Sequence, residues 1–281
     1  MIEKFDAPLT VCRLCTSANI APFTEDFNRI AIWKCCACGV RFMNPQYSAA
    51  YLEEFYAHYT TDRSEWDEPY RYTFGLYLAR FEKLITGKGR FLDIGCGNGN
   101  FIVEAAKRGW EPSGYEIDSA LAKKVSERTG LPVFSGDFPA LTLPVGSFDV
   151  VSMHHVIEHL KNPPPYLKKA HALLKPGGIL LLALPNIRSR SAVVKRLLEH
   201  VGLKRKRCGA CYDTGHHLFY FSPAVLRGFL GANGFFVLHM QSGHAARPGQ
   251  SRLTRWWART VTDRFLWKST FLVFARKQGS F

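Results

Sequence analysis

Residues 90–100 read Arg-Phe-Leu-Asp-Ile-Gly-Cys-Gly-Asn-Gly-Asn, and this stretch decides the fold. Its first half is a short apolar run typical of a buried strand. Gly95, Gly97 and Gly99 then form a turn in which the backbone can approach a ligand, because no Cβ stands in the way. Residues 101–108 follow with helical spacing, so the turn opens onto a helix N-terminus with free N–H groups. This order indicates a site for a dinucleotide or another adenosine-containing cofactor.

Two acidic residues favour a cofactor that carries a positive charge. The dinucleotide fingerprint requires glycine at position 100, where this chain has Asn100. Asp93 places a carboxylate in the expected pocket, where it would repel a pyrophosphate and hold an ammonium group. A second acid, Glu116, ends the strand expected over residues 112–117, at the interval that suits ribose hydroxyls.

The pattern resembles the class I S-adenosylmethionine-dependent methyltransferases, whose first motif is Asp-x-Gly-x-Gly-x-Gly, and the resemblance extends over residues 90–186. The resemblance implies that the adenine amino group of the cofactor donates a hydrogen bond to Asp137 and that the adenine ring packs on Phe138. The resemblance thereby gives a set of cofactor-binding residues: Asp93, Gly95, Cys96, Gly97, Gly99, Glu116, Ile117, Asp137, Phe138 and His154.

Strand patterns alternate with helical ones over the rest of this region, which indicates a parallel sheet covered on both faces. Further strands are expected at residues 131–135, 147–153, 179–184, 235–240 and 270–275, and further helices at 51–59, 68–86 and 222–234. The resemblance implies an α/β fold with a Rossmann-like, doubly wound, seven-stranded sheet over residues 46–281. Its last two strands would form an antiparallel pair.

Four cysteines near the N-terminus form two C-x-x-C pairs, namely Cys12 with Cys15 and Cys35 with Cys38. This spacing is typical of a zinc site made of four thiolates, with Cys36 as a spare or an alternative to Cys35. Because about 40 residues bury too little apolar surface alone, a metal would supply the missing stability. We expect a zinc ribbon over residues 1–45 with a structural role.

The acceptor side is expected where the strand at 147–153 ends, in the sequence Met153-His-His-Val-Ile-Glu-His-Leu160. On a helical turn, His155, Glu158 and His159 would share one face. Members of the resembled family carry Glu-His at the positions of Glu158 and His159, where the histidine is a general base or lines the pocket. His217 completes the set of candidate catalytic residues.

A third reading of these residues is a catalytic divalent metal. Ubiquinone-pathway O-methyltransferases and small-RNA 2′-O-methyltransferases carry Glu-x-x-Glu-His here and bind a metal with it. This chain resembles them but has His155 in place of the first glutamate, and His216 or His217 would add a fourth ligand. Imidazole in place of carboxylate favours Zn²⁺, Mn²⁺ or Fe²⁺ over Mg²⁺.

Positive charge is concentrated in the last third of the chain. Residues 187–281 hold 17 Lys and Arg against 3 Asp and Glu, which accounts for the whole net charge of +14. We expect an anionic partner there. Residues 187–217 would be a variable substrate lid with a further pair, Cys208 and Cys211, and residues 241–268 a basic amphipathic segment. Over 247–268 this segment suits a membrane interface, single-stranded nucleic acid or packing on its own domain.

The chain has no run long and apolar enough for a membrane span and no signal peptide, and its cysteine pairs suit a reducing compartment. A cytoplasmic enzyme, or one peripheral to the inner face of the membrane, is therefore expected. The ribbon followed by this layout resembles a bacterial family associated with envelope glycan and lipid-linked biosynthesis, and sugar C-methyltransferases. We predict methyl transfer to oxygen or carbon of a small, glycan or lipid-linked anionic acceptor. The alternatives are an RNA or protein methyltransferase and a module that binds S-adenosylmethionine without turnover.

Overall fold

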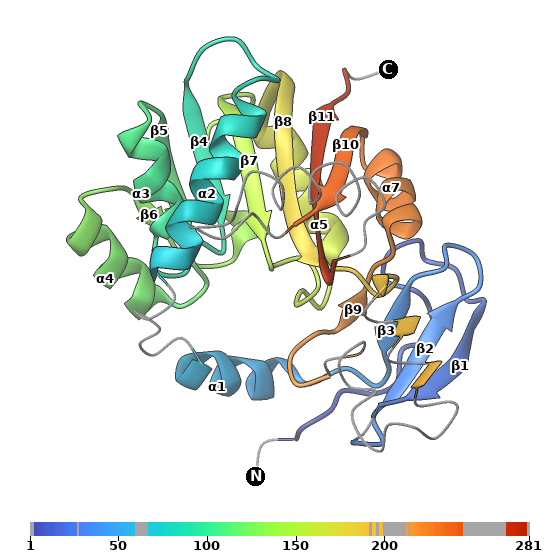
Figure 1. Cartoon of the computed structure of the whole chain (residues 1–281). Coiled ribbons are helices and arrows are strands. Elements are labelled where there is room, and N and C mark those ends of the chain that lie inside the picture. The colour runs from blue at the N-terminus through green and yellow to red at the C-terminus, as the bar shows by residue number, and fades with distance from the viewer. Residues whose placement is uncertain are drawn as a thin grey trace.

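The computed structural model describes residues 3–26, 28–59, 67–190, 193–194, 197–198, 212, 214–243 and 268–279. A large sheet flanked by helices lies beside a smaller sheet, most of whose strands come from the N-terminal module (Figure 1). Within the described residues, no helix is both long and apolar enough to cross a bilayer.

The large sheet has seven strands in the order β10-β11-β8-β7-β4-β5-β6. Their bounds are β4 Arg90–Ile94, β5 Glu111–Tyr115, β6 Val133–Phe134, β7 Phe148–His154, β8 Leu174–Pro185, β10 Phe235–Ser242 and β11 Thr270–Lys277. The five strands from β4 to β8 pair in parallel, whereas β11 is antiparallel to both of its neighbours. The expected seven-stranded Rossmann-like sheet, with its final antiparallel pair, is confirmed.

Side chains of β8 show why both faces of this sheet are buried. Ile179, Leu181 and Ala183 join one apolar cluster, and the alternate residues Leu180 and Leu182 join the other. The first cluster contains residues of α2 Asp67–Phe81, α3 Asn100–Lys107 and α4 Ser119–Thr129; the second contains residues of α5 Pro163–Leu173 and α7 Pro223–Ala232. A parallel strand covered on both faces needs such a continuous apolar run.

Helix α7 begins as its sequence predicts. The Ser222 hydroxyl accepts a hydrogen bond from the Val225 N–H at 3.3 Å, and Pro223 occupies the first helical position. Helix α4 is capped in the same way by Asp118, which accepts from the Ala120 N–H at 2.9 Å.

The small sheet has the order β1-β2-β3-β9. Its bounds are β1 Ile20–Glu25, β2 Ala31–Cys35, β3 Arg41–Met43 and β9 Phe219–Tyr220. The hairpin of β1 and β2 lies where the ribbon is expected. The fourth strand of the small sheet, β9, comes from far along the chain. Helix α1 Ala49–Tyr59 follows β3. Buried residues of the module, among them Phe42 and Met43, belong to the same apolar cluster as α5 and α7.

Several expected features fall outside the described residues. These are Cys208 and Cys211 with the basic run before them, most of the lid at 187–217, and nearly all of the amphipathic segment at 247–268.

Candidate active site

The turn between β4 and α3 lies at the switch point of the sheet, because β5 flanks β4 on one side and β7 on the other. Its three glycines have φ of 72°, 50° and 71°. A Cβ on Gly95 would lie 2.5 Å from Val156, and one on Gly99 would lie 2.6 Å from Val125. A Cβ on Gly97 would meet no atom of the described residues within 4 Å. Two glycines thus allow close packing, and the third borders open space.

Glu116 fixes this turn against the end of β5. Its Oε2 accepts a hydrogen bond from the Gly97 N–H at 2.9 Å, and its Oε1 accepts one from the Ile117 N–H at 2.9 Å. Burial raises the pKa of this carboxyl, although the backbone N–H donors act in the opposite direction. Ile117 beside it is 58% exposed and presents an apolar surface next to the turn.

Asp93 lies beneath the turn and is only 2% exposed. The Ser152 hydroxyl of β7 donates a hydrogen bond to its Oδ1. Burial raises the pKa of Asp93 to about 7, with a further increase from the nearby Glu116 charge and an opposing effect of the Ser152 hydrogen bond. The fold therefore holds a carboxyl that a nearby cation would ionise.

The remaining predicted cofactor residues surround the same edge in different environments. Asp137 is exposed and precedes the short helix Phe138–Ala140. Phe138 itself is fully buried and packs on Tyr115 and Tyr166, at ring centroid distances of 4.9 and 5.4 Å. His154 packs against Phe74 of α2 at 5.2 Å. The role of Phe138 as a platform for adenine therefore stays a prediction.

The Cys96 side chain points toward β5 and is 7% exposed. A Cβ on Gly114 would lie 2.7 Å from its sulfur, so that strand needs glycine opposite the turn. Burial is the main cause that raises the pKa of this thiol. Cys96 therefore supports the turn as a neutral, packed side chain.

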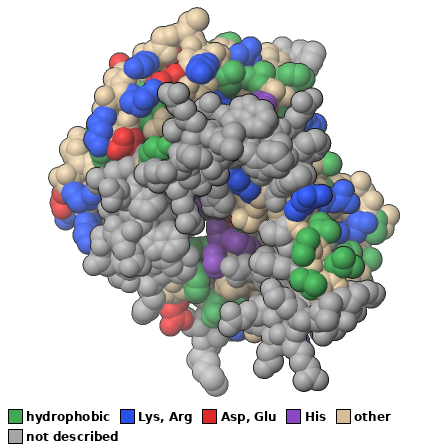
Figure 2. Space-filling model, in the orientation of Figure 1, with side chains coloured by type: hydrophobic (Ala, Val, Ile, Leu, Met, Phe, Trp, Pro, Cys, Tyr) green, Lys and Arg blue, Asp and Glu red, His purple; other side chains and the backbone are tan. Residues whose placement is uncertain are grey.

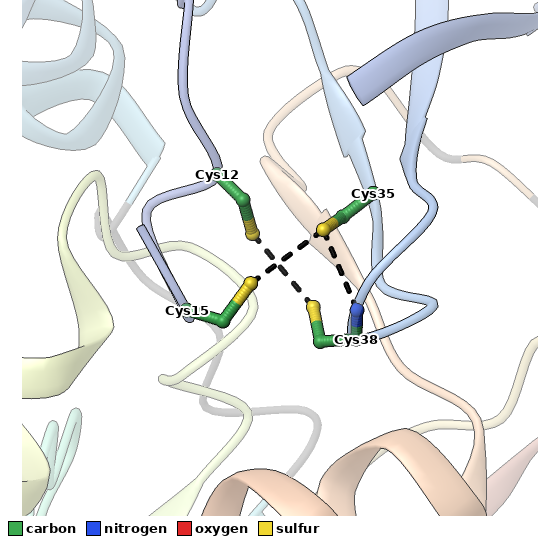
Figure 3. A group of neighbouring side chains, drawn as sticks. All are labelled: Cys12, Cys15, Cys35 and Cys38. Carbon is green, nitrogen blue, oxygen red and sulfur yellow. Dashed lines mark hydrogen bonds between the residues drawn. The ribbon is translucent and has the colours of Figure 1, made fainter. Parts of the chain in front are cut away.

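The four N-terminal cysteines point toward one another (Figure 3). Their sulfur atoms all lie within 4.8 Å of one another, with Cys12 and Cys38 3.8 Å apart and Cys15 and Cys35 3.5 Å apart. The contact with Cys38 lowers the pKa of Cys12 to about 5 and raises that of Cys38, as in two thiols that share a proton. Zinc–sulfur bonds of about 2.3 Å in a tetrahedron place sulfurs about 3.8 Å apart, so the cluster fits zinc.

His155 and Glu158 form a pair at the end of β7. His155 Nδ1 lies 3.0 Å from Glu158 Oε1; the His155 side chain is 33% exposed and that of Glu158 is 1% exposed. Burial would raise the pKa of Glu158, yet the His155 hydrogen bond and the neighbouring imidazoles lower it. The other carboxylate oxygen, Oε2, has no hydrogen-bond partner among the described residues.

His155 also has a backbone φ of 54°. Residues without glycine's freedom adopt this conformation at a cost and often at functional sites. The segment after β7 is consequently a turn and not the helical turn on which the shared face was expected.

His159 groups with His216 and His217, and one ring nitrogen from each lies within 4.8 Å of the others. His159 Nδ1 lies 3.0 Å from the His216 carbonyl oxygen, and its Nε2 lies 3.9 Å from Glu158 Oε1. Burial lowers the pKa of His159 and of His217 to about 3, and the neighbouring imidazoles contribute. Histidine side chains gather in a depression at the centre of the face in Figure 2.

Sequence reasoning missed two residues of α1 beside these histidines. The Phe55 ring stacks on His216 at 5.8 Å, and Tyr56 contacts His159 edge-on at 6.4 Å. Their only signal in the sequence is the helix expected at 51–59, which is rich in aromatic residues. Ser152, the partner of Asp93, carried no signal because its role depends on the pairing of β4 with β7.

The glycine turn, its two acids and the order of the strands match the layout of the class I S-adenosylmethionine-dependent methyltransferases. The model of a family described as "Methyltransferase domain" (Methyltransf_23) matches residues 65–240, and the chain belongs to this family.

Curated relatives carry a more specific name. A ubiquinone biosynthesis O-methyltransferase of Coxiella burnetii is 33% identical over 115 residues, which are 39% of this chain and 49% of that protein. One from Caulobacter sp. is 29% identical over 197 residues, 66% of this chain and 74% of its own. The chain thus spans about half the length of the first of these relatives.

Solved structures agree on the fold. An S-adenosylmethionine-dependent methyltransferase from Thermotoga maritima has a TM-score of 0.51 at 20% identity, over 81% of this chain and 98% of its own. One from Archaeoglobus fulgidus has a TM-score of 0.51 at 20% identity, over 74% and 94%.

Proposed function

We propose that this methyltransferase acts on a hydroxyl group of a small anionic acceptor, with His155 as the general base. The observation that carries the proposal is the pair of His155 and Glu158 at the carboxyl end of β7, next to the glycine turn. A buried carboxylate at Nδ1 orients the imidazole and leaves Nε2 as the nitrogen that accepts a proton. The partly exposed side chain of His155 is accessible to a substrate.

The reaction needs the acceptor oxygen in line with the donor methyl group. As the new O–CH₃ bond forms and the bond from sulfur to methyl breaks, the acceptor proton passes to His155 Nε2. Glu158 stabilises the imidazolium that results. His159 is a weaker candidate for the base, because burial lowers its pKa to about 3.

The cofactor would occupy the open space beside Gly97. In this arrangement Asp93 lies near its ammonium group, Glu116 near the ribose, and Ile117 with Asp137 near the adenine. Cys96 and Gly99 support the turn, while Phe138 and His154 pack behind it.

Two metal sites accompany the proposal. Zinc at the four cysteines is structural, because four thiolates leave no open position. A second divalent ion fits His159, His216 and His217, one ring nitrogen of each lying within 4.8 Å of the others, with Glu158 Oε1 3.9 Å from His159 Nε2. This differs from the expected set of His155, Glu158 and His159, of which His155 is paired with Glu158. When bound, such an ion would make an acceptor hydroxyl more acidic.

The names of the relatives favour a phenolic or quinone-like acceptor over a glycan, and oxygen over carbon. The metal-binding thiols suit a reducing compartment, so we place the enzyme in the cytoplasm. Contact with the inner membrane face through 247–268 stays part of the proposal. The alternative of an RNA acceptor is tested by the transfer assay below, which includes an RNA fraction.

The test is methyl transfer from tritiated S-adenosylmethionine to separated phenol, nucleotide-sugar, lipid, RNA and protein fractions. We expect label in the phenol or lipid fraction, and at least a 100-fold loss with Glu158→Gln. Glu127→Gln, which alters an exposed acid paired with Lys123 on α4, is the matched control and should retain activity. Label in RNA or protein alone would replace the proposed acceptor, and binding without transfer would leave only a binding module.

A further inference from the structure

The segment that carries His216 and His217 has no regular structure until β9 begins at Phe219. It is held on one side by the turn after β7. The Leu218 and Phe219 N–H groups both donate to the Glu158 carbonyl oxygen, at 2.8 and 3.0 Å. The position of the histidines relative to the proposed base therefore depends on what holds the other side.

The other side is held by the cysteine module. Strand β9 pairs with β3, with Phe219 opposite Phe42, and the Met43 N–H donates to the Leu218 carbonyl oxygen at 2.9 Å. Just after β3, the Tyr47 hydroxyl donates to the Thr214 carbonyl oxygen at 2.8 Å.

Thr214 makes the most specific of these contacts. It is fully buried, and its hydroxyl donates to Asp26 Oδ2 in the loop between β1 and β2. Asp26 Oδ1 closes the same loop by accepting from the Ile30 N–H at 2.7 Å. The Asp26 carboxylate thus holds both this loop and the segment that carries His216 and His217.

Two of the four cysteines border the turn that leads into β3, the strand that pairs with β9. Cys35 ends β2 and Cys38 lies in the turn that leads to β3, where the Cys35 N–H donates to the Val40 carbonyl oxygen at 2.9 Å. A metal at the four sulfurs would fix this turn and therefore the position of β3. Without it, this turn would depend on its hydrogen bonds and on the apolar packing of the module against α5 and α7.

We infer that the four-cysteine module is a positioning scaffold for residues 212–220, so that its metal sets the acceptor side of the active site while the cofactor side is independent of it. The inference rests on the proposed function for the role of the histidines. Thr214 and Asp26 are positioning residues, because they act through the segment that they hold.

The first test is hydrogen–deuterium exchange on the full-length, zinc-loaded protein and on Cys38→Ser, with Cys36→Ser as matched control because Cys36 is outside the cluster. We expect exchange over 212–220 to become at least tenfold faster in Cys38→Ser. Exchange over 90–117 and the Kd for S-adenosylmethionine should stay within twofold. Equal deprotection of both regions, or none over 212–220, would overturn the inference. This result does not depend on finding an acceptor.

The second test separates positioning from stability. Thr214→Val keeps the shape of the side chain but removes the hydroxyl, and Thr214→Ser retains it. We expect Thr214→Val to keep its zinc and cofactor affinity while kcat falls about tenfold, with recovery in Thr214→Ser. Equal activity of Thr214→Val and wild type would contradict the inference; absent activity in wild type would refute the proposed function instead.

Discussion

Asp93 is a carboxyl that folding removes from water, and burial raises its pKa from 3.8 to about 7. Its folded pKa lies above its unfolded one, so the stability linked to its protonation is complete below about pH 4 and is lost as pH rises through 7. A bound ammonium group would favour the ionised form.

We therefore predict that the affinity for S-adenosylmethionine increases between about pH 6 and pH 8, with proton release on binding. Calorimetry in buffers of different ionisation enthalpy measures both quantities. Asp93→Asn should bind weakly and without this pH dependence, whereas Asp149→Asn, paired with Lys175 at the opposite edge, should behave as wild type. Proton uptake on binding would contradict the assignment.

His155 combines a left-handed backbone with a proposed catalytic imidazole. Asparagine tolerates this backbone but cannot accept the proton. His155→Asn should therefore lower kcat by about 100-fold or more while the melting temperature changes little. Arg29→Asn, at a similar φ of 58° in the N-terminal module, is the control for the backbone effect. Full activity of His155→Asn would exclude it as the base.

At the level of the secondary-structure elements, the glycines of the turn between β4 and α3 have two roles. Gly95 and Gly99 permit close packing, whereas Gly97 faces open space among the described residues. Gly97→Ala and Gly130→Ala should each cost about 1 kcal/mol of folding stability, because both positions have positive φ and room for a methyl group. Only Gly97→Ala should reduce cofactor affinity, by tenfold or more. Equal affinities by calorimetry would place the cofactor elsewhere.

Most elements of the large sheet follow from local patterns. The buried strands β4, β7 and β8 each contain a short apolar run, and Ser222 with Pro223 marks the start of α7. Strand β9 was not predicted, because two aromatic residues carry no strand signal and its partner β3 lies far away in the sequence. The four cysteines were found from spacing alone. The cluster of His159, His216 and His217 depends on that distant pairing and on the backbone of His155.

At the level of the whole molecule, the cysteine module and the methyltransferase fold share a core, and β9 of the later chain completes the small sheet. We predict one cooperative unfolding transition in calorimetry, because neither part can unfold without exposing apolar surface of the other. Removing the cysteine-bound metal with a chelator should shift this whole transition to lower temperature. Two separate transitions, of which only one responds to the chelator, would indicate independent domains.

Strand β9 also has a consequence for biosynthesis. On the ribosome, β3 emerges early, while its neighbour in the finished sheet is made only after the parallel core has been translated. Until then the ribbon has an exposed edge that can pair with other nascent chains. Early loading of zinc would hold β3 in the folded ribbon until β9 is made, so metal starvation should appear first as aggregation of newly made protein.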